Sequence, residues 1–343
     1  MARIFTPVRI LVAGLVLFGV AAFLYLVPSD QYVLLPDRAR PLAPFVKIKG
    51  ERSDHDGGGI YYVAVEIKKA SVLEKLFHGL HEGATLVPAE AIRAPGESEG
   101  QHRKEELQAM ALSQQVGAAV ALKALGYDVN VHSPGTVILA VDPKGPAAGK
   151  LRARDIVVTV DGRPAPSLSD LRRLVRRHRP GDRVQLTVRR GQKVEKVVIK
   201  TVPDPKIRTR PIIGVLTTCA VQTFTKIDLP VPVQIDLGQV GGPSAGLAFA
   251  LDVVEELGHD VDHGYRVAAS GEICVDGTVA AVGGLKQKTI GAKRAGVDVF
   301  LVPAGENAKE ARRYAGDMRV IPVHSFRQAL RALATLPRIA QKA

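Results

Sequence analysis

The spacing of apolar residues divides the chain into segments of different character. Between residues 127 and 202 the spacing is mostly that of strands, with one amphipathic helix predicted over Ser169–His178. The predicted strands there are Thr136–Val141, Ile156–Val160, Val184–Val188 and Val194–Ile199. A short, strand-rich segment with a single helix predicts a small domain of its own.

From residue 207 to 338, strands and helices alternate. Strands are predicted over Ile212–Val221, Val231–Ile235, Val267–Val275, Val299–Val302 and Val320–Val323. Helices are predicted over Ala245–Glu256, Lys288–Ala295, Ala308–Ala315 and Ser325–Ala334. This order is typical of an α/β or α+β domain that is large enough for its own hydrophobic core.

The most apolar stretch lies near the N-terminus. Ile10–Val27 contains 18 residues without a charge, close to the length that spans a bilayer core. Arg3 and Arg9 precede it, which predicts a cytoplasmic N-terminus. Residues 1–28 are therefore predicted to be a cytoplasmic stub and transmembrane helix. This predicts a single-pass protein of the cell membrane with the bulk of the chain extracytoplasmic. A cleaved signal peptide is the alternative.

Residues 29–126 contain a predicted strand and two helices. The strand covers Ile60–Ile67, a short helix covers Ser71–His81, and a long helix covers Glu105–Leu125. Because the long helix exceeds what a linker needs, we expect the strand to pack with the 207–338 domain. The 127–202 unit is then an insertion, and the chain is an α+β multidomain protein.

Charge and composition narrow the choice of partners. The net charge is +13, aromatic residues make up 5%, and Trp is absent, so stacking platforms for single-stranded nucleic acid are not expected. The spacing of the densest basic group places it on the solvent face of the predicted helix: Arg172, Arg173, Arg176, Arg177 and Arg179. We predict no nucleic-acid partner. Binding to nucleic acid or a membrane surface through the net charge is the least favoured hypothesis.

Cys219 and Cys274 are the only cysteines in the sequence. Each lies in an apolar, strand-like segment, and two cysteines do not make a disulfide framework. Buried free thiols are predicted, with a disulfide as the alternative in an oxidising compartment.

The first candidate for chemistry is Ser244, in the run Gly241-Gly242-Pro243-Ser244-Ala245-Gly246. The glycines and the proline predict a tight turn, and an apolar helix follows directly. Unpaired N–H groups at a helix N-terminus favour a developing negative charge, which suits a nucleophile with an oxyanion hole beside it. An N-cap serine is the alternative, and from this segment alone it is favoured.

The second candidate lies in Gly283-Gly284-Leu285-Lys286-Gln287-Lys288, which opens another helix. The helix dipole disfavours a cation at this end, so these lysines point to a purpose other than solvation. A desolvated lysine has a lowered pKa and can act as a general base for a hydroxyl. One of the two lysines suffices for this, and Lys286 can point to solvent.

Together these segments resemble the proteolytic domain of the Lon proteases. The resemblance also rests on Ser270-Gly271-Glu272-Ile273, Val299-Phe300-Leu301-Val302-Pro303 and Val320-Ile321-Pro322-Val323, in matching order. It implies a serine endopeptidase with Ser244 as nucleophile, Lys288 as general base, and Ser270 where the family has a hydroxyl residue that bonds the lysine. Gly242, Pro243 and Ala245 would form the nucleophile and oxyanion loop.

The 127–202 unit resembles a PDZ domain. The resemblance rests on Pro134-Gly135-Thr136-Val137, Leu151-Arg152-Ala153-Arg154-Asp155-Ile156-Val157 and Val160-Asp161-Gly162. It implies that Gly135, Thr136 and Val137 belong to the loop that captures a peptide's terminal carboxylate. A small β-rich domain with no peptide ligand is the alternative.

Several motifs are absent from the sequence. Gly145–Lys150 is one residue short of a Walker A motif, and no His-Glu-x-x-His zinc motif occurs, so neither ATP, a metal nor another cofactor is expected.

His78 and His81 are interpreted as surface residues, and a triad with Asp262 and His263 is disfavoured because both are expected in a loop. Gly241 stands where ATP-dependent Lon enzymes have an acidic residue, which could change the gating of the serine loop.

The leading hypothesis is an ATP-independent, membrane-anchored peptidase that cleaves secreted or membrane-associated polypeptides. Its PDZ domain would recognise or gate the substrate. A non-catalytic PDZ adaptor with a protease-like scaffold is the alternative. Because Lon relatives form rings, a homo-oligomer is also compatible with the resemblance.

Overall fold

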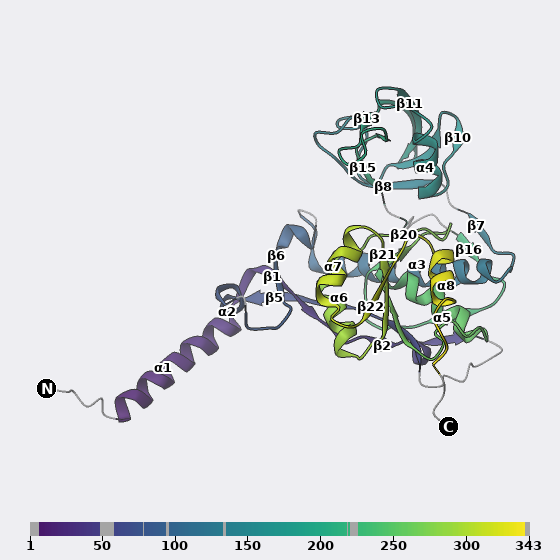
Figure 1. Ribbon diagram of the computed structural model, residues 1–343. Helices are drawn as coiled ribbons and strands as arrows, with labels where there is room; N and C mark the ends of the chain where they lie inside the picture. The colour runs from purple at the N-terminus through teal and green to yellow at the C-terminus, as the bar shows by residue number, and fades with distance from the viewer. Residues whose placement is uncertain are drawn as a thin grey trace.

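The computed structural model describes residues 7–48, 58–77, 79–93, 96–132, 135–217, 219 and 226–339. Arg3, His78, Pro134 and Val221, which enter the sequence interpretation, lie outside these residues. Figure 1 shows a small domain next to a larger one, with helix α1 (Pro7–Leu26) projecting away from the larger domain.

The larger domain is built on a sheet with the strand order β2-β4-β18-β21-β22. These strands are Arg40–Pro41, Gly59–Tyr62, Arg266–Ala269, Val299–Pro303 and Arg319–Val323. From β4 to β22 neighbouring strands are parallel, and β2 is antiparallel to β4. The pairing of β4 with β18 agrees with the expectation that the Ile60 segment packs with the 207–338 region.

Side chains of this sheet alternate between two buried faces, as expected for parallel strands covered on both sides. On one face Val267 and Leu301 pack in a core with Phe249 of α5 (Gly246–Glu256). The same core takes in α3 (Glu99–Ala124) and α8 (Phe326–Leu333). On the other face Ala268 and Phe300 pack against α6 (Leu285–Arg294) and α7 (Glu306–Tyr314).

The small domain is inserted into the larger one. Helix α3, which precedes it, buries Met110, Val116 and Ala121 in the core of the larger domain. The chain leaves through β7 (Asn130–His132) and returns through β16 (Lys226–Asp228), and these two strands pair antiparallel. Both ends of the small domain are therefore connected to one place on the larger domain.

The small domain has a sheet in the order β12-β11-β9-β8-β15, with β10 (Arg163–Pro164) beside β9. The strands of this order are Lys193–Lys200, Arg183–Arg190, Ile156–Val160, Thr136–Val141 and Val215–Thr217. Helix α4 (Leu168–Val175) buries Leu171 and Leu174 in the domain's core. Its N-cap is Ser167, whose hydroxyl accepts the Asp170 N–H at 3.1 Å.

Two predicted strands are arranged differently from the expectation. The run Ile212–Val221 was assigned to the larger domain, but β14 (Pro211–Ile212) pairs with β13 (Val202–Pro203), and β15 pairs with β8 of the small domain. The predicted strand Ile60–Ile67 is divided into β4 and β5 (Val65–Ser71), which belong to different sheets. The strand pattern of a segment does not say which sheet the segment joins.

The remaining elements are short. Strand β1 (Pro28–Pro36) pairs with β5 and with β6 (Thr85–Pro88). Helix α2 (Val72–Leu76) is shorter than the predicted Ser71–His81 helix; Ser71 and Glu74 form a capping box at its start. The other pairs are β3 (Val46–Ile48) with β17 (Val233–Ile235) and β19 (Glu272–Ile273) with β20 (Val279–Ala280). Single-turn helices are η1 (Ala43–Phe45), η2 (Ala89–Ala91) and η3 (Pro243–Ala245).

The predicted membrane anchor is contradicted. No helix among the described residues is long and apolar enough to cross a membrane. The predictions of a transmembrane helix and of a single-pass protein of the cell membrane are therefore wrong.

The prediction of two free thiols is also wrong. Cys219 and Cys274 form a disulfide with a Cα–Cα distance of 4.7 Å. Cys219 follows the end of β15, and Cys274 lies in the hairpin between β19 and β20. The fold brings the two cysteines together, although 55 positions separate them in the sequence. The bond joins the edge strand of the small domain to the larger domain.

Candidate active site and peptide groove

The turn before α5 holds Ser244 at the start of that helix. Gly242 has a φ of +88°, a conformation that favours glycine, and Pro243 follows at the first position of η3. The Gly242 N–H donates to the carbonyl oxygen of Glu106 at 2.9 Å. The Ser244 carbonyl oxygen accepts the Gly271 N–H at 2.8 Å. Contacts with two other segments thus fix the backbone on both sides of Ser244.

Helix α6 carries Lys288 in its first turn. Gly284 precedes the helix with a φ of +70°, and the Lys288 N–H donates to the Gly284 carbonyl at 2.9 Å. Lys288 is 4% exposed, and burial lowers the pKa of its amine to about 7. A lysine with this pKa is substantially neutral near pH 7, as a general base must be.

Ser244, Ser270 and Lys288 meet at one point. The Lys288 Nζ lies 2.6 Å from the Ser244 Oγ and 3.1 Å from the Ser270 Oγ. The Ser270 hydroxyl also donates to the Ser244 carbonyl oxygen at 3.3 Å, and Ser270 is fully buried. The three residues come from the start of α5, the end of β18 and the first turn of α6. A buried amine in contact with a serine hydroxyl is the arrangement that activates a nucleophile.

Lys286 does not point to solvent as the sequence interpretation allowed. Its Nζ donates to the Ala84 carbonyl at 2.9 Å and to the Thr85 Oγ1 at 3.3 Å. The Gln287 amide donates to the same Thr85 Oγ1 at 2.8 Å. These bonds hold the start of α6 against the segment before β6, so the two lysines have separate surroundings.

Gly291 lets α6 approach the backbone after β1. A Cβ at position 291 would overlap the carbonyl oxygen of Asp37. The Gly291 carbonyl in turn accepts the Ala39 N–H at 3.3 Å. The close approach positions the helix that carries Lys288.

We therefore expect Gly291→Ala to lower the free energy of unfolding by about 3 kcal/mol, since overpacking against backbone cannot be relieved by a side-chain rotation. Urea denaturation followed by circular dichroism measures this change. Gly100→Ala in α3 is the control, because a Cβ there meets nothing within 4 Å. Alanine at such a helical site is expected to be neutral or stabilising. Equal stability of the two variants would contradict the tight packing of α6.

Of the three residues predicted to capture a peptide's end, Thr136 and Val137 lie in β8, inside the small domain's sheet, and Gly135 directly precedes that strand. Thr136 and Val137 pair with β9, and the Thr136 hydroxyl donates to the Ala165 carbonyl at 3.3 Å. Thr136 is 2% exposed. β8 has β9 on one side and β15 on the other, so β15 is the edge strand on that side of the sheet.

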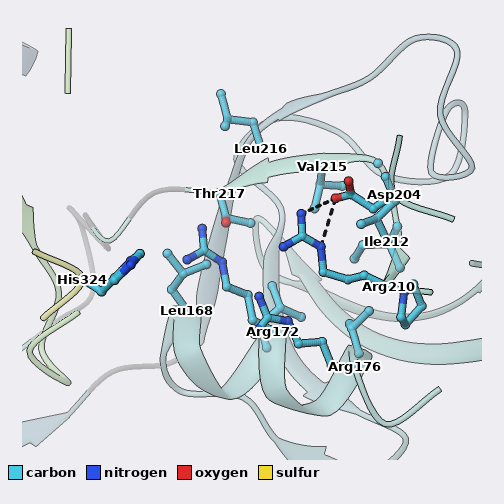
Figure 2. Close-up of a pocket in the computed structure, with 15 residues that line it drawn as sticks. Leu168, Arg172, Arg176, Asp204, Arg210, Ile212, Val215, Leu216, Thr217 and His324 are labelled. Carbon is cyan, nitrogen blue, oxygen red and sulfur yellow. Dashed lines mark hydrogen bonds and ion pairs between the residues drawn. The ribbon is translucent and has the colours of Figure 1, made fainter. Parts of the chain in front are cut away.

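A groove runs between this edge and α4 (Figure 2). Its volume is about 580 Å³. From α4 it is lined by Leu168, Leu171, Arg172, Val175 and Arg176, and from the opposite side by Asp204, Arg210–Thr217 and His324. A groove between a sheet edge and a helix is the shape that binds an extended peptide by strand addition. The peptide-binding role of residues 135–137 stays a prediction, and the groove along α4 and β15 is a second candidate site for a peptide.

Two models of protein families match parts of this chain. Residues 218–335 match the Lon protease (S16) C-terminal proteolytic domain. Residues 123–201 match the PDZ domain. The chain carries a PDZ domain and a Lon-type proteolytic domain.

Curated Lon proteases are similar to part of this chain. The Lon protease of Chloroflexus aggregans is 38% identical over 101 residues, which are 28% of this chain and 12% of that protein. The Lon protease of Xanthomonas oryzae pv. oryzae is 36% identical over 106 residues, which are 30% of this chain and 12% of that protein. This chain thus spans only a small part of the length of the relatives that it matches.

One of the solved structures with similarity to part of this chain is a PDZ domain. The PDZ domain of an SdrC-like protein from Listeria monocytogenes is 26% identical and covers 27% of this chain and 97% of that chain, with a TM-score of 0.25.

Helix α3 contributes residues to the serine turn that the sequence interpretation missed. The Ser113 hydroxyl, on a buried face of α3, donates to the Pro243 carbonyl at 2.9 Å. A Cβ at position 241 would lie 2.9 Å from the Glu106 Cβ. Position 241 therefore has no room for the acidic side chain of ATP-dependent Lon enzymes. The sequence signal that could have identified Ser113 was a polar residue within the apolar stripe of a predicted helix.

Asp262 and His263 do not join the Ser244 site. The His263 ring bonds the Leu336 carbonyl oxygen, with 2.9 Å between Nδ1 and O. Asp262 belongs to a group with Glu255 and Asp260 that could, among the described residues, hold a metal ion. The Glu255 carboxylate accepts the Val261 N–H at 2.8 Å and the Asp262 N–H at 3.1 Å, and burial raises its pKa to about 7. These bonds close the loop after α5.

Proposed function

We propose that this chain is an ATP-independent serine endopeptidase in which Ser244 is the nucleophile and Lys288 the general base. The contact of 2.6 Å between the Lys288 Nζ and the Ser244 Oγ carries the proposal. Burial of the lysine, which lowers its pKa to about 7, supports the same assignment. The match to the Lon proteolytic domain supports a serine peptidase.

The proposed reaction is acyl transfer. Neutral Lys288 takes the proton of the Ser244 hydroxyl as the Oγ attacks the carbonyl carbon of the scissile peptide bond. The resulting ammonium then protonates the leaving amine, and a water molecule hydrolyses the acyl-enzyme. Ser270 holds the lysine amine by its bond of 3.1 Å and is a positioning residue.

The oxyanion of the tetrahedral intermediate needs N–H donors near Ser244. Pro243 has no N–H, and the Gly242 N–H already donates to Glu106. We assign the role to the N–H groups of Ser244 and Ala245 at the start of α5, where the helix dipole favours negative charge. One such donor contributes about 2.7–4 kcal/mol in known enzymes.

Two further parts of the proposal concern energy and substrate. The sequence has no Walker A motif, which supports cleavage without ATP by this chain. The groove of the PDZ domain supports polypeptides as substrates. We propose that it binds the C-terminal end of a polypeptide as an added strand on β15.

The test of the peptidase is degradation of an unfolded model protein by the purified chain without ATP, with the products identified by mass spectrometry. Internal cleavage that ATP does not increase is the expected result. Binding of peptides to the PDZ groove without cleavage of any substrate would refute the peptidase and support a non-catalytic adaptor instead.

The pH dependence of cleavage should follow Lys288. Because only the neutral amine accepts the serine proton, kcat/KM should rise about tenfold per pH unit below pH 7 and level off above it. A buffer series from pH 5 to pH 10 measures this profile. A rate that continues to rise beyond pH 9 would indicate a lysine with an ordinary pKa and would contradict the buried base.

A further inference from the structure

Three arginines face the PDZ groove, and their surroundings differ (Figure 2). Arg210 is paired with Asp204, with 3.0 Å between its Nε and the Asp204 Oδ2. Arg172, on α4, and Arg176, the C-cap of that helix, lie one turn apart and make no ion pair with any residue in the described part of the chain. The groove therefore presents two cations without a bound counter-charge.

The surroundings of Arg172 disfavour its charge. Partial desolvation, and then the charges of Arg176 and Arg210, lower the pKa of the Arg172 guanidinium, while Asp276 acts in the opposite direction. Like charges that line one groove repel each other, and an anion between them relieves this repulsion. The charge pattern fits an acidic occupant.

The direction of β15 sets the direction of an added strand. β15 runs from Val215 to Thr217, and the turn before it contains Gly214 with a φ of +71°. A peptide that pairs antiparallel with β15 places its C-terminus at this turn. Figure 2 shows His324 on the side of Leu168 and Thr217 that faces away from Arg210. His324 follows β22, so the upstream part of such a peptide leaves the groove toward the Lon-type domain.

We propose that the groove takes a polypeptide C-terminus with an acidic side chain two residues before the terminal residue, and that Arg172 and Arg176 bind this side chain. The inference deepens, and rests on, the peptide binding proposed above for the PDZ domain. In an added strand, side chains alternate, so the terminal side chain and the one two residues upstream face α4. Leu171 and Val175 provide an apolar surface there, and the two arginines provide the charge.

The test uses fluorescent octapeptides with a C-terminal Val and the full chain carrying Ser244→Ala, which prevents cleavage. One peptide has Glu two residues before the terminus, a second has Gln there, and a third has Glu one residue before the terminus. Fluorescence anisotropy measures Kd. We expect the first peptide to bind about tenfold more tightly than the other two, the usual size of a charge-assisted contact.

The protein variants assign the effect to α4. Arg172→Gln with Arg176→Gln should abolish the preference for Glu over Gln. Arg177→Gln is the matched control: it removes an exposed arginine of the same segment that does not line the groove, and it should keep the preference. Equal binding of the Glu and Gln peptides to the unaltered groove would overturn the inference.

An amidated form of the first peptide separates this inference from the proposed function. Tight binding of the free acid with loss of binding for the amide supports capture of a C-terminus, whether or not Arg172 and Arg176 create a preference for Glu. If the amide binds as tightly as the free acid, capture of the terminus is refuted. If no peptide binds at all, the peptide-binding role of the domain is refuted, and the acidic preference with it.

Discussion

Ser244→Ala and Lys288→Met are each expected to reduce kcat/KM for an unfolded protein substrate by about 10⁴- to 10⁶-fold, the range found when a nucleophile or its base is removed from a serine protease. The physical reason is the single contact of 2.6 Å between the two side chains. Without the hydroxyl no acyl-enzyme forms, and without the amine the hydroxyl keeps its proton. Since the two residues act as a unit, the double variant should be no slower than either single variant.

Measuring the stability of each variant distinguishes a protein that has lost only a catalytic group from one that no longer folds. Lys288→Met keeps the length of the side chain and removes an amine whose burial lowers its pKa to about 7, so the variant should unfold at the same or a higher urea concentration. Lys286→Met is the control. Lys286 bonds Ala84 and Thr85, so its substitution should leave the chemical step intact. Residual cleavage above a hundredth of the wild-type rate in Ser244→Ala would refute the assigned nucleophile.

Removal of the disulfide is expected to have the largest effect on stability. The bond closes a loop over a sequence separation of 55 positions. Closing a loop of that length in the unfolded chain corresponds to about 4 kcal/mol by loop entropy. The double substitution Cys219→Ser and Cys274→Ser should therefore lower the free energy of unfolding by this amount. Denaturation followed by circular dichroism measures the change.

The wild-type protein supplies its own control. In the presence of a thiol reductant it should unfold at the denaturant concentration of the double serine variant, and the variant itself should not respond to the reductant. Identical midpoints for the oxidised and reduced wild-type protein would show that the bond does not stabilise the fold.

The proposed catalytic residues could be predicted from the sequence because the chemistry is encoded in local motifs. Gly242 and Pro243 impose the turn before Ser244, and the helix start that follows exposes N–H groups there. A lysine in the first turn of a helix conflicts with the helix dipole, which pointed to Lys286 and Lys288 alike. The resemblance to Lon proteases then selected Lys288. The assignment of Ser270 depended on the resemblance to Lon proteases. These signals involve neighbouring residues and need no knowledge of the fold.

The peptide groove could not be found in this way. The segment Ile212–Val221 has the apolar pattern of a strand, and that pattern is the same whichever sheet the strand joins. Its return to the small domain makes β15 an edge strand of the sheet and encloses β8, which contains Thr136 and Val137. The arginines of α4 were assigned to a solvated face, because only the position of β15 turns part of that face into the wall of a groove.

Local sequence thus marked Ser244 and the two lysines as candidates and predicted most helices, since turns, caps and apolar periodicity act over a few residues. The two domain types and the choice of the dyad depended on the resemblance to Lon proteases and PDZ domains. The tertiary structure decided the disulfide, the contacts of Glu106 and Ser113 with the serine turn, and the edge strand of the PDZ domain. Each of these joins segments that are far apart in the chain. The spacing of residues within one segment does not predict such a contact, because the contact depends on how the whole core packs.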